Sequence, residues 1–184
     1  MASSPRRPLA HLVAVDMGYG HERAAYALRD IAHDEIVTAN NYAGIPAGDH
    51  ALWEAGRMYY ETVSRLQPLP LIGKSIFHAF VDHLQEIDPF YPRRDLSHPT
   101  LQLRQVWHSI THQKQGRHLV ESLRAKYKNG RKPLPFVTTF FLPAFAAEEF
   151  DYPGDIYIVI CDADIARVWA PKDPKQSRIK YFAP

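Results

Sequence analysis

A short apolar run followed by two glycines and an alanine-rich segment constrains the fold of this chain more than any other feature. Residues 11–16 have the sequence HLVAVD, which has the length and composition of a buried strand. Gly18 and Gly20 follow, and apolar residues then recur at helical spacing over residues 22–32. Residues 35–39 are a second strand candidate. Strand, helix and strand in this order predict a parallel βαβ unit.

The rest of the chain continues the alternation of helices and strands. Helical periodicity predicts helices over residues 49–66, 71–87 and 101–127. Asp49 is the expected N-cap of the first, and Gly116 is expected to divide the last into two pieces. Apolar, β-branched or aromatic runs predict strands over residues 134–141 and 155–161, and one more short strand is expected over residues 178–182. Short helices are expected over residues 144–150 and 162–169. Because the strand runs lack polar alternation, we expect an α/β fold with a doubly wound, mostly parallel sheet and helices on both faces.

Length and composition bound the number of domains. With 184 residues, 46% of them apolar, the chain is long enough to bury one substantial hydrophobic core but too short to bury two of that size. We expect a flexible arm over residues 1–10 and a single α/β domain over residues 11–184. Residues 177–184 have the pattern of a strand that enters a turn, so we expect this domain to be the N-terminal half of a longer protein.

Charge and cysteine content limit the partners and the location. The 22 basic and 20 acidic residues are mixed along the chain without a basic block, so a nucleic-acid partner is not expected. No apolar run reaches the length of about 18 residues that a transmembrane helix needs, and residues 1–8 do not lead into the apolar core of a signal peptide. The single cysteine, Cys161, follows an aliphatic run, which predicts a buried, inert thiol in a reducing compartment. We therefore expect a cytoplasmic protein.

The loop with the sequence DMGYGH, residues 16–21, is the first candidate site. In an open parallel sheet, ligands bind outside the carboxyl ends of the strands, where this loop is expected. Gly18 and Gly20 would let the backbone approach a ligand, and the start of the next helix suits a phosphate or an oxyanion. His21 is placed to act as a base near neutral pH. A dinucleotide fingerprint is excluded because Arg23 stands where the third glycine would be. The alternative is a plain tight turn in which His21 caps the helix.

The segment VDMGYGHERAAYAL, residues 15–28, resembles the opening of glycosyltransferases with the GT-B fold. It is most similar to those related to monogalactosyldiacylglycerol synthase and to the peptidoglycan N-acetylglucosaminyltransferase, which open with a strand, a glycine-rich loop bearing a histidine, and an alanine-rich helix. Outside this segment the resemblance is topological and covers an N-terminal half-molecule. It implies a Rossmann-like, acceptor-binding domain that needs no metal or other cofactor. The nucleotide-sugar donor would bind to a C-terminal domain that is absent from this chain.

The resemblance also assigns roles to residues. It implies that His21 is the general base on the acceptor side and that Gly18, Tyr19 and Gly20 shape the loop, although Tyr19 departs from the small residue common there. Thr138 and Thr139 end a predicted strand, so their hydroxyls could face the same crevice; the alternative is that these hydroxyls are buried and bonded to the backbone. The expected function is therefore the acceptor-binding half of a metal-independent glycosyltransferase, which is not expected to be active alone.

Asp162 and Asp164 offer a rival interpretation. They follow an apolar strand, and two carboxylates one residue apart can hold Mg²⁺ or Mn²⁺ beside a diphosphate, as in single-domain GT-A glycosyltransferases. Alternatively, one of them is the N-cap of the helix predicted after this strand. A non-catalytic module that binds a nucleotide or a sugar is a third alternative.

Two segments bear on the acceptor. Residues 69–80 and 90–94 mix apolar and basic side chains, which suits either a membrane-docking edge with a lipid-linked acceptor or a core helix with a solvated loop. Under the first alternative, the protein would make peripheral contact with the inner face of the membrane.

Overall fold

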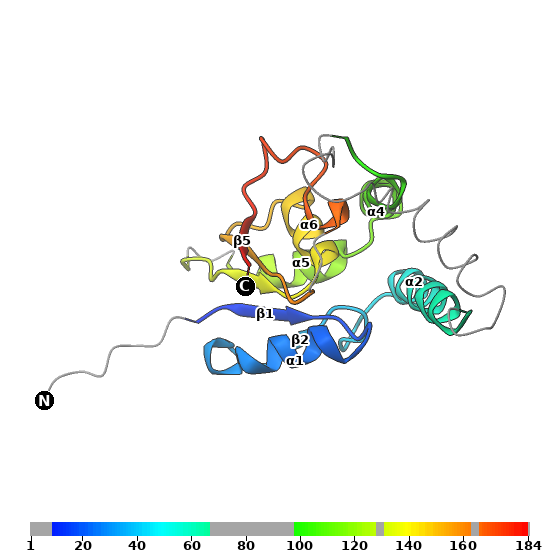
Figure 1. Cartoon of the computed structure of the whole chain (residues 1–184). Helices are drawn as coiled ribbons and strands as arrows, with labels where there is room; N and C mark the ends of the chain where they lie inside the picture. The colour runs from blue at the N-terminus through cyan, green and yellow to red at the C-terminus, as the bar shows by residue number, and fades with distance from the viewer. Residues whose placement is uncertain (1–8, 67–97, 128–130, 163–165, 184) are drawn as a thin grey trace, which may run out of the picture. The chain divides into compact units, whose positions relative to one another are not determined.

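The computed structural model describes residues 9–66, 98–127, 131–162 and 166–183 (Figure 1). The chain divides into two compact units, each of which is built from separate stretches of sequence. The first unit consists of Met1–Ile45, Gly116–Asp162 and Arg178–Pro184, and the second consists of Pro46–Gln115 and Ala163–Ser177. The predicted helix over residues 71–87 and the mixed apolar and basic segments 69–80 and 90–94 lie outside the described residues.

The first unit is built on a five-stranded sheet in which all neighbouring strands are parallel. The strands are β1 (His11–Ala14), β2 (Val37–Thr38), β3 (Phe136–Thr138), β4 (Ile156–Val159) and β5 (Lys180–Phe182). Their order is β2-β1-β3-β4-β5, so the chain leaves β1 in one direction and returns to its other side at β3. This point of reversal is where open α/β sheets form a ligand crevice. The predicted α/β fold and its βαβ opening are confirmed.

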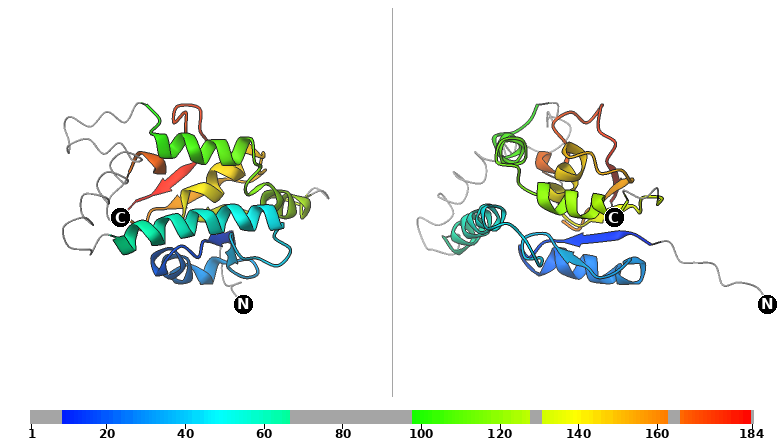
Figure 2. Two further views of the ribbon diagram at one scale, coloured as in Figure 1. Left: turned by 90° about the vertical axis from the view of Figure 1, so that its right-hand side faces the viewer. Right: turned by 180° about the vertical axis from the view of Figure 1, so that it is seen from behind.

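Helices lie on both faces of this sheet, as expected. Helix α1 (Tyr19–Ala27) packs on one face, where Ala25 joins Leu12, Ala14 and Val137 in a buried cluster. Because side chains alternate along a strand, Val13 and Phe136 point to the opposite face, and both are fully buried. Helices α5 (Arg117–Ala125) and α6 (Phe141–Glu149) belong to that face, and α6 contacts β3 and β4. Figures 1 and 2 show α1 on one side of β1 and these two helices on the other.

The second unit is helical in its described part. It contains α2 (Ala47–Leu66), which is drawn along its 20-residue length in the left view of Figure 2, together with α4 (Leu101–Thr111) and the short 3₁₀ helix η2 (Arg167–Trp169). The hydroxyl of Thr100 caps α4 by accepting from the N–H of Leu103 at 3.3 Å. None of the helices in the described ranges combines the length and the apolar character that a membrane crossing requires.

Several element boundaries differ from the predicted ones. Helix α1 ends at Ala27, and the 3₁₀ helix η1 (Arg29–Ile31) follows where a single helix was expected. Helix α2 begins two residues before Asp49, because Pro46 fits the start of a helix and its carbonyl accepts from the N–H of His50. Asp49 therefore lies in the first turn and is not the N-cap.

The region after β3 also differs from the prediction. A strand was expected to run to residue 141, but β3 ends at Thr138, whose hydroxyl accepts from the N–H of Phe140 and so forms a turn. Helix α6 then begins at Phe141, because Pro143 is tolerated in a first helical turn. The predicted division at Gly116 is confirmed, since this residue has a φ of 80° and precedes α5. In the described part of the helix predicted over residues 162–169, the structure has the 3₁₀ helix η2, whose N-cap is Ala166 and not Asp162.

Candidate functional site

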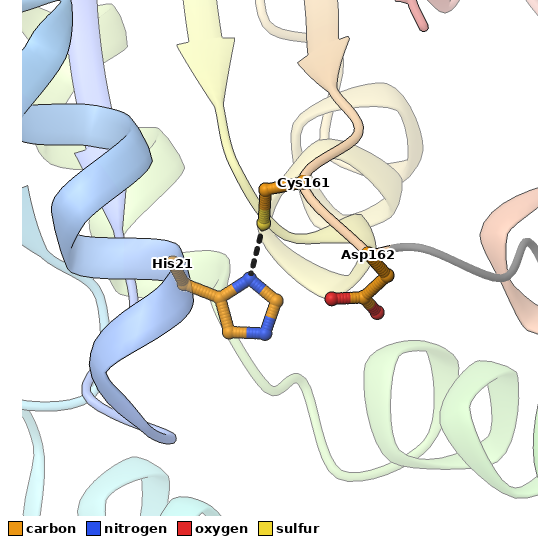
Figure 3. Close-up of side chains that lie close together, drawn as sticks. All are labelled: His21, Cys161 and Asp162. Carbon is orange, nitrogen blue, oxygen red and sulfur yellow. Dashed lines mark hydrogen bonds between the residues drawn. The ribbon is translucent and has the colours of Figure 1, made fainter. Parts of the chain in front are cut away.

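Polar residues that follow three strands meet at the carboxyl edge of the sheet in the first unit. Figure 3 shows three of them, His21, Cys161 and Asp162. His21 lies in the first turn of α1, which follows β1. Thr139 directly follows β3, and Cys161 and Asp162 follow β4. Because β1 and β3 flank the reversal of strand order, the cluster occupies the position that the topology favours for a ligand.

The glycine loop before α1 has one position that requires glycine. Gly18 has φ 107° and ψ 154°, a region that is essentially restricted to glycine, and it precedes the first residue of α1, Tyr19. Gly20 lies inside the helix, where a Cβ added to it would meet no atom within 4 Å. The backbone freedom predicted for both glycines is therefore used at Gly18 alone.

A buried asparagine fixes the loop from the side of β2. The N–H of Asp16 donates to Oδ1 of Asn40 at 2.8 Å, and Nδ2 of Asn40 donates to the carbonyl of Asp16 at 2.9 Å. Asn40 is 3% exposed, so both hydrogen bonds are shielded from water. The loops after β1 and β2 are thereby joined at the base of the site.

The imidazole of His21 is oriented by the main chain after β3. Its Nδ1 lies 2.9 Å from the carbonyl oxygen of Thr139, and the ring of Phe140 packs edge-on at a centroid distance of 4.9 Å. A carbonyl oxygen only accepts hydrogen bonds, so Nδ1 carries the proton in this contact. The neutral ring then has its lone pair on Nε2, which is the arrangement that a general base needs.

Cys161 is in contact with the same imidazole. Its Sγ lies 3.1 Å from Nδ1 of His21, and the thiol donates to the carbonyl of Thr139 at 3.7 Å. The thiol is partly exposed, whereas the sequence predicted a buried thiol. Desolvation raises the pKa of the Cys161 thiol, and the carboxylate of Asp162 raises it further. At neutral pH the neutral thiol therefore dominates, which does not suit a nucleophilic cysteine.

The two predicted threonines do not play the same part. The hydroxyl of Thr139 donates to the carbonyl of His21 at 2.9 Å. The hydroxyl of Thr138 bonds to the backbone of Phe140 and is fully buried, so it serves the turn after β3. Of the residues expected at the site, the structure brings His21 and Thr139 into direct contact. Asp164 lies outside the described residues.

Sequence reasoning missed Asn40 and the contact between Cys161 and His21. Asn40 and Cys161 each stand two positions beyond the last residue of a parallel strand, and the carboxyl ends of parallel strands share one edge of the sheet. That rule, applied to every strand, would have placed them beside the glycine loop.

A shallow groove lies on the α1 face of the sheet, between α1 and the strands β1 and β2. Its volume is about 390 Å³, and it is lined by Ala14, Glu22, Arg23, Tyr26, Ile36 and Thr38. The groove combines an apolar floor with one acidic and one basic side chain from α1, next in sequence to His21. It therefore offers a surface on which a polar ligand with an apolar part could lie.

No protein-family model matches this chain, and neither a curated protein nor a solved structure is significantly similar to it.

Proposed function

We propose that this chain is the acceptor-binding domain of a metal-independent glycosyltransferase in which His21 is the general base. The observation that carries the proposal is the orientation of the imidazole, whose Nδ1 donates to the carbonyl of Thr139 at the point where the strand order reverses. The resemblance of residues 15–28 to the opening of GT-B enzymes supports the same role.

The proposed chemistry is the attack of an acceptor hydroxyl on the anomeric carbon of a nucleotide sugar. Nε2 of His21 takes the hydroxyl proton while the new glycosidic bond forms. The bond between the anomeric carbon and the diphosphate breaks, and its electron pair leaves with the nucleoside diphosphate. The carbonyl of Thr139 stabilises the imidazolium that results, because Nδ1–H continues to donate to it.

The acceptor would bind on the α1 face of the sheet, with its hydroxyl reaching His21. The groove between α1 and β2 has apolar and charged lining residues, which suits an acceptor with a hydroxyl-bearing head and an apolar body. A lipid-linked sugar or a glycerolipid has this chemistry. The donor would be held by a domain outside this chain, so transfer activity belongs to the complete protein.

The test is the substitution His21→Ala in the complete protein, assayed with a panel of nucleotide sugars by the release of nucleoside diphosphate. Loss of the base should lower kcat by roughly 10²-fold or more, without a comparable fall in Tm. His112→Ala is the matched control, because His112 is an exposed histidine at the end of α4. Unchanged turnover in His21→Ala would rule out the base assignment. The assay includes a chelator, so that it measures the metal-free enzyme.

A further inference from the structure

We propose that His21, Cys161 and Asp162 form a binding site for a thiophilic divalent cation, with Zn²⁺ the expected ion. One donor atom of each residue lies within 4.8 Å of the others, and Nδ1 of His21 is 3.1 Å from Sγ of Cys161 (Figure 3). The inference does not depend on the proposed transferase activity.

The spacing of the donor atoms fits a small ion. In a tetrahedral zinc site, Zn–N and Zn–S bonds of about 2.0–2.3 Å place neighbouring donor atoms roughly 3.3–3.6 Å apart. Nδ1 of His21 and Sγ of Cys161 are 3.1 Å apart, close to this separation. Both atoms could therefore bind one ion at these bond lengths after a small shift of the side chains.

Asp162 is the third ligand of the proposed site, and one of its carboxylate oxygens lies within 4.8 Å of the other two donor atoms. Its side chain is exposed and directly follows Cys161. In Figure 3 its carboxylate lies beside the imidazole, on the side of Cys161. Rotation of this side chain would bring one oxygen to the ion.

The ligand types select the class of metal. A thiolate, an imidazole and a carboxylate suit Zn²⁺ or Co²⁺, whereas Mg²⁺ prefers a shell made of oxygen atoms. Three protein ligands would leave a fourth position for water or for an oxygen of a bound ligand, as in catalytic zinc sites. This site differs from the oxygen-only pair Asp162 and Asp164 that the sequence suggested.

Binding of the ion changes the protonation of both residues that contact it. The thiol of Cys161 releases one proton to solvent, and the proton on Nδ1 of His21 is replaced by the metal, so that the neutral ring carries its proton on Nε2. A metal-bound His21 therefore cannot act as the base through Nε2. Under the proposed function, zinc would be an inhibitor of transfer.

The experiment is a titration of the whole chain with Co²⁺, followed by absorption spectroscopy. Cys161 is the single cysteine of the sequence, so a thiolate-to-cobalt charge-transfer band can arise from this residue alone. We expect this band together with intense visible d–d bands, at one equivalent of Co²⁺. Zn²⁺ should abolish the spectrum by displacement, and an excess of Mg²⁺ should leave it unchanged.

Variants assign the ligands. Cys161→Ser should remove the charge-transfer band, and Asp162→Asn should weaken Co²⁺ binding by roughly tenfold or more without affecting the fold, because Asp162 is exposed. His21→Gln should also weaken binding. The matched control is His112→Ala, which breaks an exposed histidine pair at the end of α4 whose ring centroids are 4.7 Å apart. Co²⁺ binding to the wild type without a thiolate charge-transfer band would overturn the proposal. The same holds if both His21→Gln and Asp162→Asn bind Co²⁺ as tightly as the wild type and keep the band.

Discussion

His21 and Thr139 lie 118 residues apart in the sequence and are joined by two hydrogen bonds. The imidazole Nδ1 donates to the carbonyl of Thr139, and the hydroxyl of Thr139 donates to the carbonyl of His21, each at 2.9 Å. One bond sets the tautomer of the ring, and the other ties the first turn of α1 to the end of β3. Because the first bond uses a main-chain oxygen, no side-chain substitution at position 139 removes it directly.

The first prediction separates these two bonds. Thr139→Val keeps the carbonyl and removes the hydroxyl, so the free energy of unfolding should fall by about 1 kcal/mol. The ring of His21 should keep its proton on Nδ1, because the carbonyl still accepts it. Urea denaturation measures the first effect, and ¹⁵N chemical shifts of the imidazole measure the second. A change of tautomer in this variant would show that the hydroxyl, rather than the carbonyl, orients the ring.

The second prediction concerns the two glycines of the loop. Gly18→Ala forces a Cβ into a region of backbone conformation reserved for glycine and should cost roughly 1–3 kcal/mol of stability. Gly20→Ala is the matched comparison, because Gly20 lies in α1 with open space around it. This variant should be neutral or should stabilise the protein by up to about 1 kcal/mol, since alanine favours the helix. Thermal unfolding of the two variants side by side checks the difference. Equal losses in both would contradict the assignment.

The third prediction uses the single thiol. Desolvation and the nearby carboxylate of Asp162 raise the pKa of Cys161, so the thiolate fraction at a given pH is lower than in a free thiol. Alkylation by iodoacetamide should therefore be slower than that of a cysteine-containing peptide at pH 8. The rate should continue to rise at pH values where the peptide has reached its plateau.

Intact mass spectrometry gives these rates without ambiguity, because the chain has one cysteine. Asp162→Asn should lower the midpoint of the pH profile by removing the carboxylate. A midpoint below that of the peptide would contradict the environment described for Cys161.

The fourth prediction concerns His11, which lies at the opposite end of β1 from the site. Burial lowers the pKa of His11 to about 4, and the positive charges of Lys126 and His33 act in the same direction, while Asp34 opposes them. Between pH 6.5 and about 4 the unfolded chain binds a proton at this residue that the folded chain does not bind. The free energy of unfolding should therefore decrease as the pH falls through this window, by up to roughly 3 kcal/mol.

His11→Gln isolates this contribution from those of the other histidines. The variant lacks the titrating group, so its stability should depend less on pH between 6.5 and 4 than that of the wild type. Urea denaturation at several pH values measures both curves. Parallel curves would show that His11 is not the group responsible.

Local sequence patterns were sufficient for the fold but not for the element boundaries. The βαβ opening was predictable because the strand run, the glycine loop and the apolar periodicity are all local signals. The end of β3 was not, because the apolar run continues through Phe140 and Phe141, and the turn depends on the hydroxyl of Thr138. The start of α2 was also missed, because it depends on Pro46, whose carbonyl accepts from the N–H of His50.

Part of the site was predictable from the parallel topology of the sheet. Parallel topology places His21 and Thr139 at one edge of the sheet, which made their proximity foreseeable. Which hydroxyl faces His21 depends on the twist and register of β3, and these are set by packing rather than by sequence pattern. The contact with Cys161 required the position of β4 as well.

The hydrogen bonds of the site also imply an order of assembly. Asp16 and Asn40 are 24 residues apart, whereas His21 is separated from Thr139 by 118 residues and from Cys161 by 140. Closing a short loop costs less chain entropy, so we expect the loop of the βαβ unit to form early in folding. The imidazole acquires its partners only when β3 and β4 have joined β1. During synthesis, a nascent chain that stops before residue 136 would hold a formed glycine loop with an unoriented histidine.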